Sequence, residues 1–107
     1  MNAPYYVALT NCPNQEVATK LATACVENKL AACVNIVPTV QSVYQWQGKI
    51  EHDEESLLII KTTQSKITQL GDFIQQNHPY DVPEFITLNI ESGAENYLDW
   101  LAQSIRS

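Results

Sequence analysis

Residues 32–62 read ACVNIVPTVQSVYQWQGKIEHDEESLLIIKT, and this stretch decides the fold of the chain. Its first half, residues 32–46, is a long extended segment in which Pro38 favours an edge position, a bulge or a bend. Gln47-Gly48 predicts a hairpin turn, because glycine supplies the positive φ that such turns need. Residues 49–62 then return as the partner strand. Both arms are long for a hairpin, since strands in globular proteins usually have about 5–6 residues.

The segments before this hairpin predict a strand and a helix. Residues 5–10 are apolar and rich in β-forming side chains, which is typical of a strand. Residues 11–14 predict a turn, with Asn14 as the N-cap of a helix that runs to about Asn28. One face of that helix is apolar and carries Val17, Leu21, Ala24 and Cys25.

The segments after the hairpin predict a helix, a strand and a last helix. The second helix ends near Asn77 and is marked by Ile67, Leu70 and Ile74. Two prolines, Pro79 and Pro83, bracket a rigid loop, and residues 85–90 predict a strand. Residues 92–95 have the form of a capping box, which would start a helix with Leu98, Leu101 and Ile105 on one side.

The predicted order is therefore β-α-β-β-α-β followed by an extra helix. This order is typical of an α+β protein of the ferredoxin-like, split β-α-β type, with an antiparallel sheet and two helices on one face. A chain of 107 residues has the length of one domain, so we expect a single domain over residues 1–107.

The strand around residues 57–60 points beyond a single chain. A sheet covered on one face should alternate polar and apolar residues, but Leu57-Leu58-Ile59-Ile60 does not alternate. Both faces of this strand favour burial, and a second subunit can cover the face that the helices leave open. The alternative is that the C-terminal helix folds over that face.

The charge and the cysteines narrow the classes of function. A net charge of -6 disfavours nucleic acid as a partner and suits cations, although solubility alone also explains such a surface. The N-terminus has no signal-peptide pattern, and no apolar run approaches the ~20 residues of a membrane span. Three cysteines without a secretion signal predict reduced thiols and a cytoplasmic protein.

The loop between the two prolines holds the first candidate site. His78 ends a helix and precedes a proline, so its backbone is restricted, and Tyr80 and Glu84 follow in the same loop. An imidazole, a phenol and a carboxylate together can bind a borderline cation or carry out acid–base chemistry near neutral pH. The alternative is a histidine that caps the helix beside a packed tyrosine.

The hairpin offers a second group. A two-residue turn at Gln47-Gly48 pairs Trp46 with Lys49 and Tyr44 with Glu51. Alternation then splits the acidic run, residues 51–55, between two faces, so it cannot act as one metal site within the strand. One face carries Tyr44, Trp46, Lys49, Glu51 and Asp53, and the other carries Val43, Ile50, His52 and Glu54. A solvated edge explains these charges better than a ligand role for His52.

The thiols and one lysine complete the candidates. Cys25 lies on an apolar helix face and is predicted to be core. For Cys12 and Cys33 a small apolar role is favoured over a ligand role, but soft thiolates make them the natural candidates for Cu(I). Lys61 closes an apolar strand, so its ammonium group should reach solvent or find a carboxylate.

Five short segments stand in a fixed order along the chain. They are Leu30-Ala31-Ala32-Cys33-Val34, Tyr44-Gln45-Trp46-Gln47-Gly48-Lys49, Lys61-Thr62-Thr63, His78-Pro79-Tyr80-Asp81-Val82-Pro83-Glu84 and Tyr97-Leu98-Asp99-Trp100-Leu101. Together, in this order, they resemble the CutA (divalent-cation-tolerance) family. The resemblance implies a compact homotrimer whose long hairpins wrap neighbouring subunits. It also implies a cleft near a subunit boundary, lined by Lys61, His78, Tyr80 and Glu84, with Tyr44 and Trp46 from a hairpin. The second helix has Phe73 and Ile74 and no thiol, so the chain departs there from a cysteine-rich version of the family and offers no cysteine ligand for copper on that helix.

The resulting hypothesis is a non-enzymatic, cytoplasmic homotrimer that binds divalent metal, copper first, and is linked to metal tolerance. The metal candidates are His78, Glu84, Cys12 and Cys33, and the small-molecule candidates are Tyr44, Trp46, Lys61 and Tyr80. The alternative is a small-molecule-binding regulatory trimer similar to the signalling trimers of nitrogen control, which is an analogy of fold alone. An enzyme using His78 and Glu84 ranks last, because no nucleophile or cofactor motif supports it.

Overall fold

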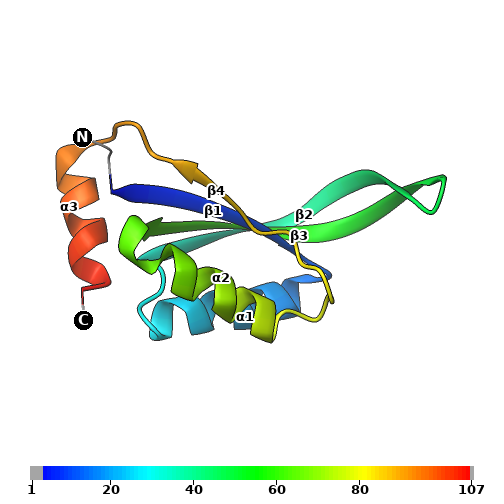
Figure 1. Ribbon diagram of the computed structural model, residues 1–107, viewed down its shortest axis with the longest axis horizontal. Coiled ribbons are helices and arrows are strands. Elements are labelled where there is room, and N and C mark those ends of the chain that lie inside the picture. The colour runs from blue at the N-terminus through cyan, green and yellow to red at the C-terminus, as the bar shows by residue number, and fades with distance from the viewer. Residues whose placement is uncertain (1–3, 107) are drawn as a thin grey trace.

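The computed structural model describes residues 4–106 and contains a four-stranded antiparallel sheet in the order β2-β3-β1-β4 (Figure 1). Two helices, α1 and α2, cover one face of the sheet, and α3 stands at one of its ends. The strands are β1 (Tyr5–Cys12), β2 (Cys33–Trp46), β3 (Lys49–Thr63) and β4 (Ile86–Asn89). The helices are α1 (Gln15–Glu27), α2 (Ile67–Asn77) and α3 (Glu95–Ser104), and a short 3-10 turn, η1 (Gln64–Lys66), precedes α2. This order confirms the predicted β-α-β-β-α-β arrangement with an extra helix.

The β2-β3 hairpin projects from the body of the molecule and gives it a length of 45 Å against 26 and 22 Å (Figure 1). Its register pairs Trp46 with Lys49 and Tyr44 with Glu51, as predicted. Gln47 and Gly48 have φ values of 51° and 81°, so both central turn residues have the positive φ of a type I′ turn. The ladder is interrupted between Val37 and Val40, which is the bulge that Pro38 favoured, and β2 is an edge strand.

The core lies between the sheet and the helices α1 and α2. Leu58 and Ile60 of β3 are fully buried there, and so are Leu70 and Ile74 of α2. Cys25 is also fully buried, which confirms its prediction as core. No helix of residues 4–106 is long and apolar enough to cross a membrane.

Two local predictions at element ends were wrong and one is confirmed. Asn14 caps α1, since its Oδ1 accepts from the Val17 N–H at 2.8 Å. Residues 11 and 12 belong to β1, because they continue its pairing with β3 to Ser56. The capping box at residues 92–95 does not form: Ala94 is the N-cap of α3, and it has no side chain that could bond the helix N–H groups.

The other face of the sheet is largely open. Leu57 and Ile59 of β3 are only half-buried on this face, and the exposed fractions of Ile86 and Leu88 are 51% and 54%. Helix α3 lies at one end of the sheet (Figure 1), and its Leu101 is buried. The alternative, in which the C-terminal helix folds over the open face, therefore holds only at one end of that face. Ile86 and Leu88 stay exposed.

Candidate functional site

The largest candidate site is a groove between the projecting hairpin and the loop that follows α2. We call it the hairpin groove; it encloses about 870 Å³. Strand alternation brings aromatic side chains of β2 and acidic side chains of β3 to its wall, and the loop supplies the opposite wall. The lining consists of Asn11, Tyr44, Trp46, Glu51, Asp53, Glu55, Tyr80, Asp81, Val82 and Glu84. Five of these described residues are acidic and none is basic.

Three hydrogen bonds hold the side chains that line the groove, and two of them connect its walls. The phenol of Tyr44 donates to Asp53, and the phenol of Tyr80 donates to Glu55 Oε2 at 2.8 Å. Asn11 Nδ2 lies 3.4 Å from Glu84 Oε1 and donates to it. The Tyr80 and Asn11 contacts join the loop to β3 and to β1, so the two walls are held relative to each other.

The two phenols stay protonated at ordinary pH. The hydrogen bond to Asp53, aided by burial and by neighbouring carboxylates, raises the pKa of Tyr44 to about 12. Burial, the bond to Glu55 and the nearby negative charges raise the pKa of Tyr80 well above its usual value. Both groups therefore act as hydrogen-bond donors to carboxylates and not as phenolate ligands.

His78 is 8% exposed and bonds two residues that line the hairpin groove, Asn11 and Tyr80. Its Nε2–H donates to the Asn11 carbonyl oxygen at 2.6 Å, and its Nδ1 accepts from the Tyr80 N–H at 3.1 Å. The carbonyl can only accept and the amide can only donate, so the tautomer with the proton on Nε2 follows. In this arrangement no nitrogen of the ring is free for a metal ion. The ring also packs against Tyr80, with 4.7 Å between the centroids.

The structure does not bring the four metal candidates together. Cys12 pairs with Ser56 on β3 and faces the helices, whereas Cys33 pairs with Lys61 and faces the open side. Because Ser56 and Lys61 are an odd number of positions apart on one strand, the two thiols point to opposite faces of the sheet. Glu84 lines the groove and His78 supports it. Within residues 4–106, no three His, Cys, Asp or Glu side chains form a group that could hold a metal ion.

Burial is a second reason why Cys12 is a poor metal ligand, and it acts on Cys25 in the same way. Burial, with a smaller contribution from Glu55, raises the pKa of Cys12 to about 11. Burial also raises the pKa of Cys25 to about 11. Both thiols are therefore protonated near neutral pH, and the thiolate is the form that binds metal.

Three of the four small-molecule candidates do meet. Tyr44, Trp46 and Tyr80 line the hairpin groove together, although Tyr80 lies in a distant part of the sequence. Lys61 lies outside the groove, and its Nζ donates to Asn35 Oδ1, so an amide takes the place of the expected carboxylate.

Sequence reasoning placed Glu51 and Asp53 beside Tyr44 and Trp46 but did not propose them as site residues. Glu55 continues the same alternation and could have been found by extending it by one step. Asn11 and Asp81 carried no such signal. Asn11 reaches the site only because β1 pairs with β3, a contact between distant parts of the chain.

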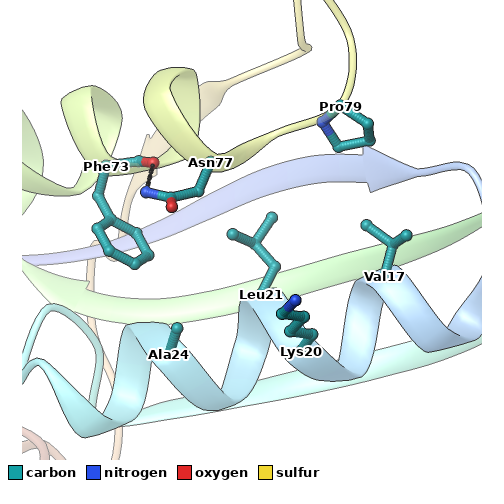
Figure 2. Close-up of a pocket in the computed structure, with 7 residues that line it drawn as sticks. All are labelled: Val17, Lys20, Leu21, Ala24, Phe73, Asn77 and Pro79. Carbon is teal, nitrogen blue, oxygen red and sulfur yellow. Dashed lines mark hydrogen bonds between the residues drawn. The ribbon is translucent and has the colours of Figure 1, made fainter.

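A second hollow, of about 310 Å³, lies between α1 and α2 (Figure 2). Figure 2 shows Val17, Leu21 and Phe73 along it, with the Asn77 amide donating to the Phe73 carbonyl at 2.8 Å. Lys20 is the one charged residue in its lining. This hollow has no acidic lining residue, so it does not fit a metal ion.

The comparisons with known proteins identify the family of the chain. A family model described as CutA1 divalent ion tolerance protein matches residues 6–104. Protein CutA, chloroplastic, from Arabidopsis thaliana is 51% identical over 104 residues, which are 97% of this chain and 57% of that protein. The chain thus spans little more than half the length of the first curated relatives it matches.

Two further relatives are matched over nearly their full length. The divalent-cation tolerance protein CutA of Thermus thermophilus is 47% identical over 98 residues, 92% of this chain and 95% of that protein. The crystal structure of CutA1 from Oryza sativa superposes with a TM-score of 0.94 at 48% identity, covering 98% of this chain and 96% of that one. With a family model matching almost from end to end, the chain belongs to the CutA1 divalent ion tolerance protein family.

Proposed function

We propose that the protein is a non-enzymatic homotrimer that binds divalent cations in the hairpin groove, with Cu(II) as the first candidate. The observation that carries this proposal is the lining itself, which has five carboxylates and no basic side chain among the described residues. Such a wall attracts cations and repels anions. The family to which the chain belongs carries divalent ion tolerance in its description.

The spacing of the carboxylates favours a partly hydrated ion. Since no three candidate ligands converge in residues 4–106, we expect one or two carboxylates and several waters around the ion. Glu84 keeps its proposed role as a ligand, together with Asp53 or Glu55, while His78 holds Asn11 and Tyr80 in position. Cu(II) comes first because most nitrogen and oxygen sites bind it more tightly than the other divalent ions of its row.

We propose a non-enzymatic function because, within residues 4–106, no pair of activated catalytic groups lines the groove. Both nitrogens of His78 are engaged, and the buried thiol of Cys12 is protonated. A general base needs a nitrogen that is free to accept a proton, and a cysteine nucleophile needs a deprotonated thiol.

The trimer is supported by two apolar surfaces. Ile86 and Leu88 are exposed on the open face of the sheet. Val43 and Ile50 are 58% and 64% exposed on the hairpin face that points away from the groove. Self-association would cover both, and the number three comes from the resemblance to the CutA family. A standard interface buries about 800 Å² on each partner. Sedimentation equilibrium tests this directly, since a chain that stays monomeric at micromolar concentration would contradict it.

Calorimetric titration with Cu(II), Zn(II) and Mg(II) tests the cation site. We expect binding to weaken in Glu84→Gln and Asp53→Asn, and to stay at the level of the parent in Glu27→Gln, an exposed glutamate at the end of α1. Equal losses in all three variants would show a general effect of charge and would remove the site from the groove.

The small-molecule alternative has its own observation. The volume of the groove falls within the range of about 300–1,000 Å³ that is typical of small-molecule sites, and three aromatic side chains line it. Thermal stabilisation by a metabolite, with metal ions silent, would favour this regulatory role.

We also propose a cytoplasmic location. The support is the state of the three cysteines, which are all free thiols in the structure, with Cys12 and Cys25 fully buried. Cell fractionation tests it; recovery from an oxidising compartment would contradict it.

A further inference from the structure

We infer that the hairpin groove also takes a linear polyamine, an organic cation whose ammonium groups are separated by short methylene chains. This ligand would use the same groove as the proposed metal ion, but the inference does not depend on metal binding. It rests on the way in which the carboxylates and the aromatic rings are distributed.

The carboxylates of β3 form a row and not a cluster. Glu51, Asp53 and Glu55 are alternate residues of one strand, so they share a face and successive positions lie about 6.8 Å apart. A single metal ion cannot contact three groups spread over such a length, in agreement with the lack of a converging set in residues 4–106. A chain with several ammonium groups can pair with them one after another.

Aromatic side chains lie next to this row. Tyr44 is directly opposite Glu51 on β2, Trp46 is two positions further along the same face, and Tyr80 reaches Glu55 from the loop. The exposed fraction of Trp46 is 60%, so most of its ring is open to the groove and to solvent. Ring faces attract ammonium groups, and they also cover methylene chains.

The phenol hydroxyls hold the carboxylates in position and leave part of their hydrogen-bond acceptor capacity free. Tyr44 donates to Asp53 and Tyr80 donates to Glu55, and each carboxylate has two oxygens that together accept several bonds. The remaining lone pairs are available to N–H donors of a ligand. Because the hydroxyls are already engaged, the phenol rings offer a ligand their faces.

The charge of the groove excludes the common anionic metabolites. The nearest basic residue by register is Lys49, which shares the face at the hairpin end and does not line the groove. Nucleotides, phosphates and dicarboxylates would meet five carboxylates without a counter-charge. Among small molecules, an extended cation fits both the charge and the shape.

The test is calorimetric titration of the full chain with spermidine and putrescine, and separately with Cu(II). We expect spermidine to bind more tightly than putrescine, because it has one more ammonium group for the row. Trp46→Leu should weaken spermidine binding by roughly threefold to tenfold, within the span of cation–π contributions. Trp100→Leu is the matched control, since Trp100 is 47% exposed on α3 and lies outside the lining. Trp46→Phe keeps a ring and should restore most of the loss.

The outcomes separate this inference from the proposed metal function. Polyamine binding without Cu(II) binding would support the inference and contradict the metal proposal, and the reverse result would overturn the inference alone. Equal effects of Trp46→Leu and Trp100→Leu on spermidine would show attraction by charge without the aromatic wall, which overturns the inference. Unchanged circular dichroism and oligomeric state in both variants are required for the comparison, and Trp46→Thr, which also removes the ring, replaces Trp46→Leu if that variant does not fold.

Discussion

His78 and Asn11 are joined by a hydrogen bond of 2.6 Å from the imidazole Nε2–H to a backbone carbonyl, across 67 positions of the chain. The same ring accepts the Tyr80 N–H through Nδ1. One buried side chain thus fixes both the end of β1 and the start of the loop that walls the hairpin groove. The histidine that resembled a ligand in the sequence is a structural support in the fold.

Replacing His78 should therefore cost both stability and cation binding. His78→Ala leaves the Asn11 carbonyl and the Tyr80 N–H without their partner, and an unsatisfied buried group costs about 1–3 kcal/mol. We expect a lower urea midpoint and weaker Cu(II) binding, because Tyr80 and Glu84 lose their position. His52→Ala, on the exposed side of the hairpin, is the control and should change little. If His52→Ala lost more Cu(II) affinity, the site would move to the hairpin face that carries His52.

The hairpin turn should tolerate only residues that accept positive φ. Gly48 has a φ of 81°, and a Cβ at this position would meet nothing within 4 Å, so Gly48→Ala would introduce backbone strain and no clash. We expect a loss of about 1–2 kcal/mol in the free energy of unfolding, measured by denaturant titration. In Gly93→Ala the new methyl meets Leu98 at an ordinary 3.4 Å, and the loss should be smaller. A larger loss at Gly93 would refute the role of the turn.

A charge on the open face should prevent self-association. Leu88 is 54% exposed in the single chain, so Leu88→Asp leaves the fold of the monomer intact. In the proposed trimer the new carboxylate would be buried without a partner, at a cost of several kcal/mol of association free energy. Sedimentation should show a smaller species, whereas Val26→Asp on α1, 42% exposed, should keep the size of the parent. Identical sizes for all three proteins would place the interface elsewhere.

The phenol of Tyr44 should lose its proton at a higher pH than an ordinary tyrosine, because it donates a hydrogen bond to Asp53. The hydrogen bond to Asp53 is the main cause that raises the pKa of Tyr44 to about 12 from 10.0. Asp53→Asn removes a negative acceptor, so its ultraviolet titration should show one more tyrosine ionising near its ordinary pH than the parent does. An unchanged titration curve would mean that the Tyr44–Asp53 bond does not persist in solution.

The buried thiols should make stability fall at high pH. Burial raises the pKa values of Cys12 and Cys25 from 9.0 to about 11 in the folded chain. The folded state therefore favours the protonated thiol, and this contribution is present below pH 9 and is lost as pH rises toward 11. The urea midpoint should decline over that window more steeply in the parent than in a Cys12→Ala, Cys25→Ala double variant. Parallel curves would assign the decline to other groups.

The hairpin was the part of the fold that the sequence predicted best, and the reason is local. Gln47-Gly48 sets the turn, the turn sets the register, and alternation then assigns Tyr44, Trp46 and the acidic residues to their faces. The support role of His78 could not be found in this way, because its partner is a backbone carbonyl of Asn11 that only the β1–β3 pairing brings near. The capping box at residues 92–95 does not form, because α3 begins two residues later than the motif places it, with Ala94 as its N-cap.

The interruption of the β2 ladder at Pro38 determines which chemistry the groove presents. Before it, odd-numbered residues of β2 such as Val37 share the open face with the odd-numbered residues of β3; after it, even-numbered residues such as Val40 do. One additional residue in β2 thus exchanges the two faces for the part of the strand beyond Pro38. Tyr44 and Trp46 therefore lie on the same face as the acidic row. With an uninterrupted ladder the same strand would present Val43 and Gln45 there, and the carboxylates would face a wall without aromatic rings. The composition of the groove is in this sense encoded by an insertion several residues away from it.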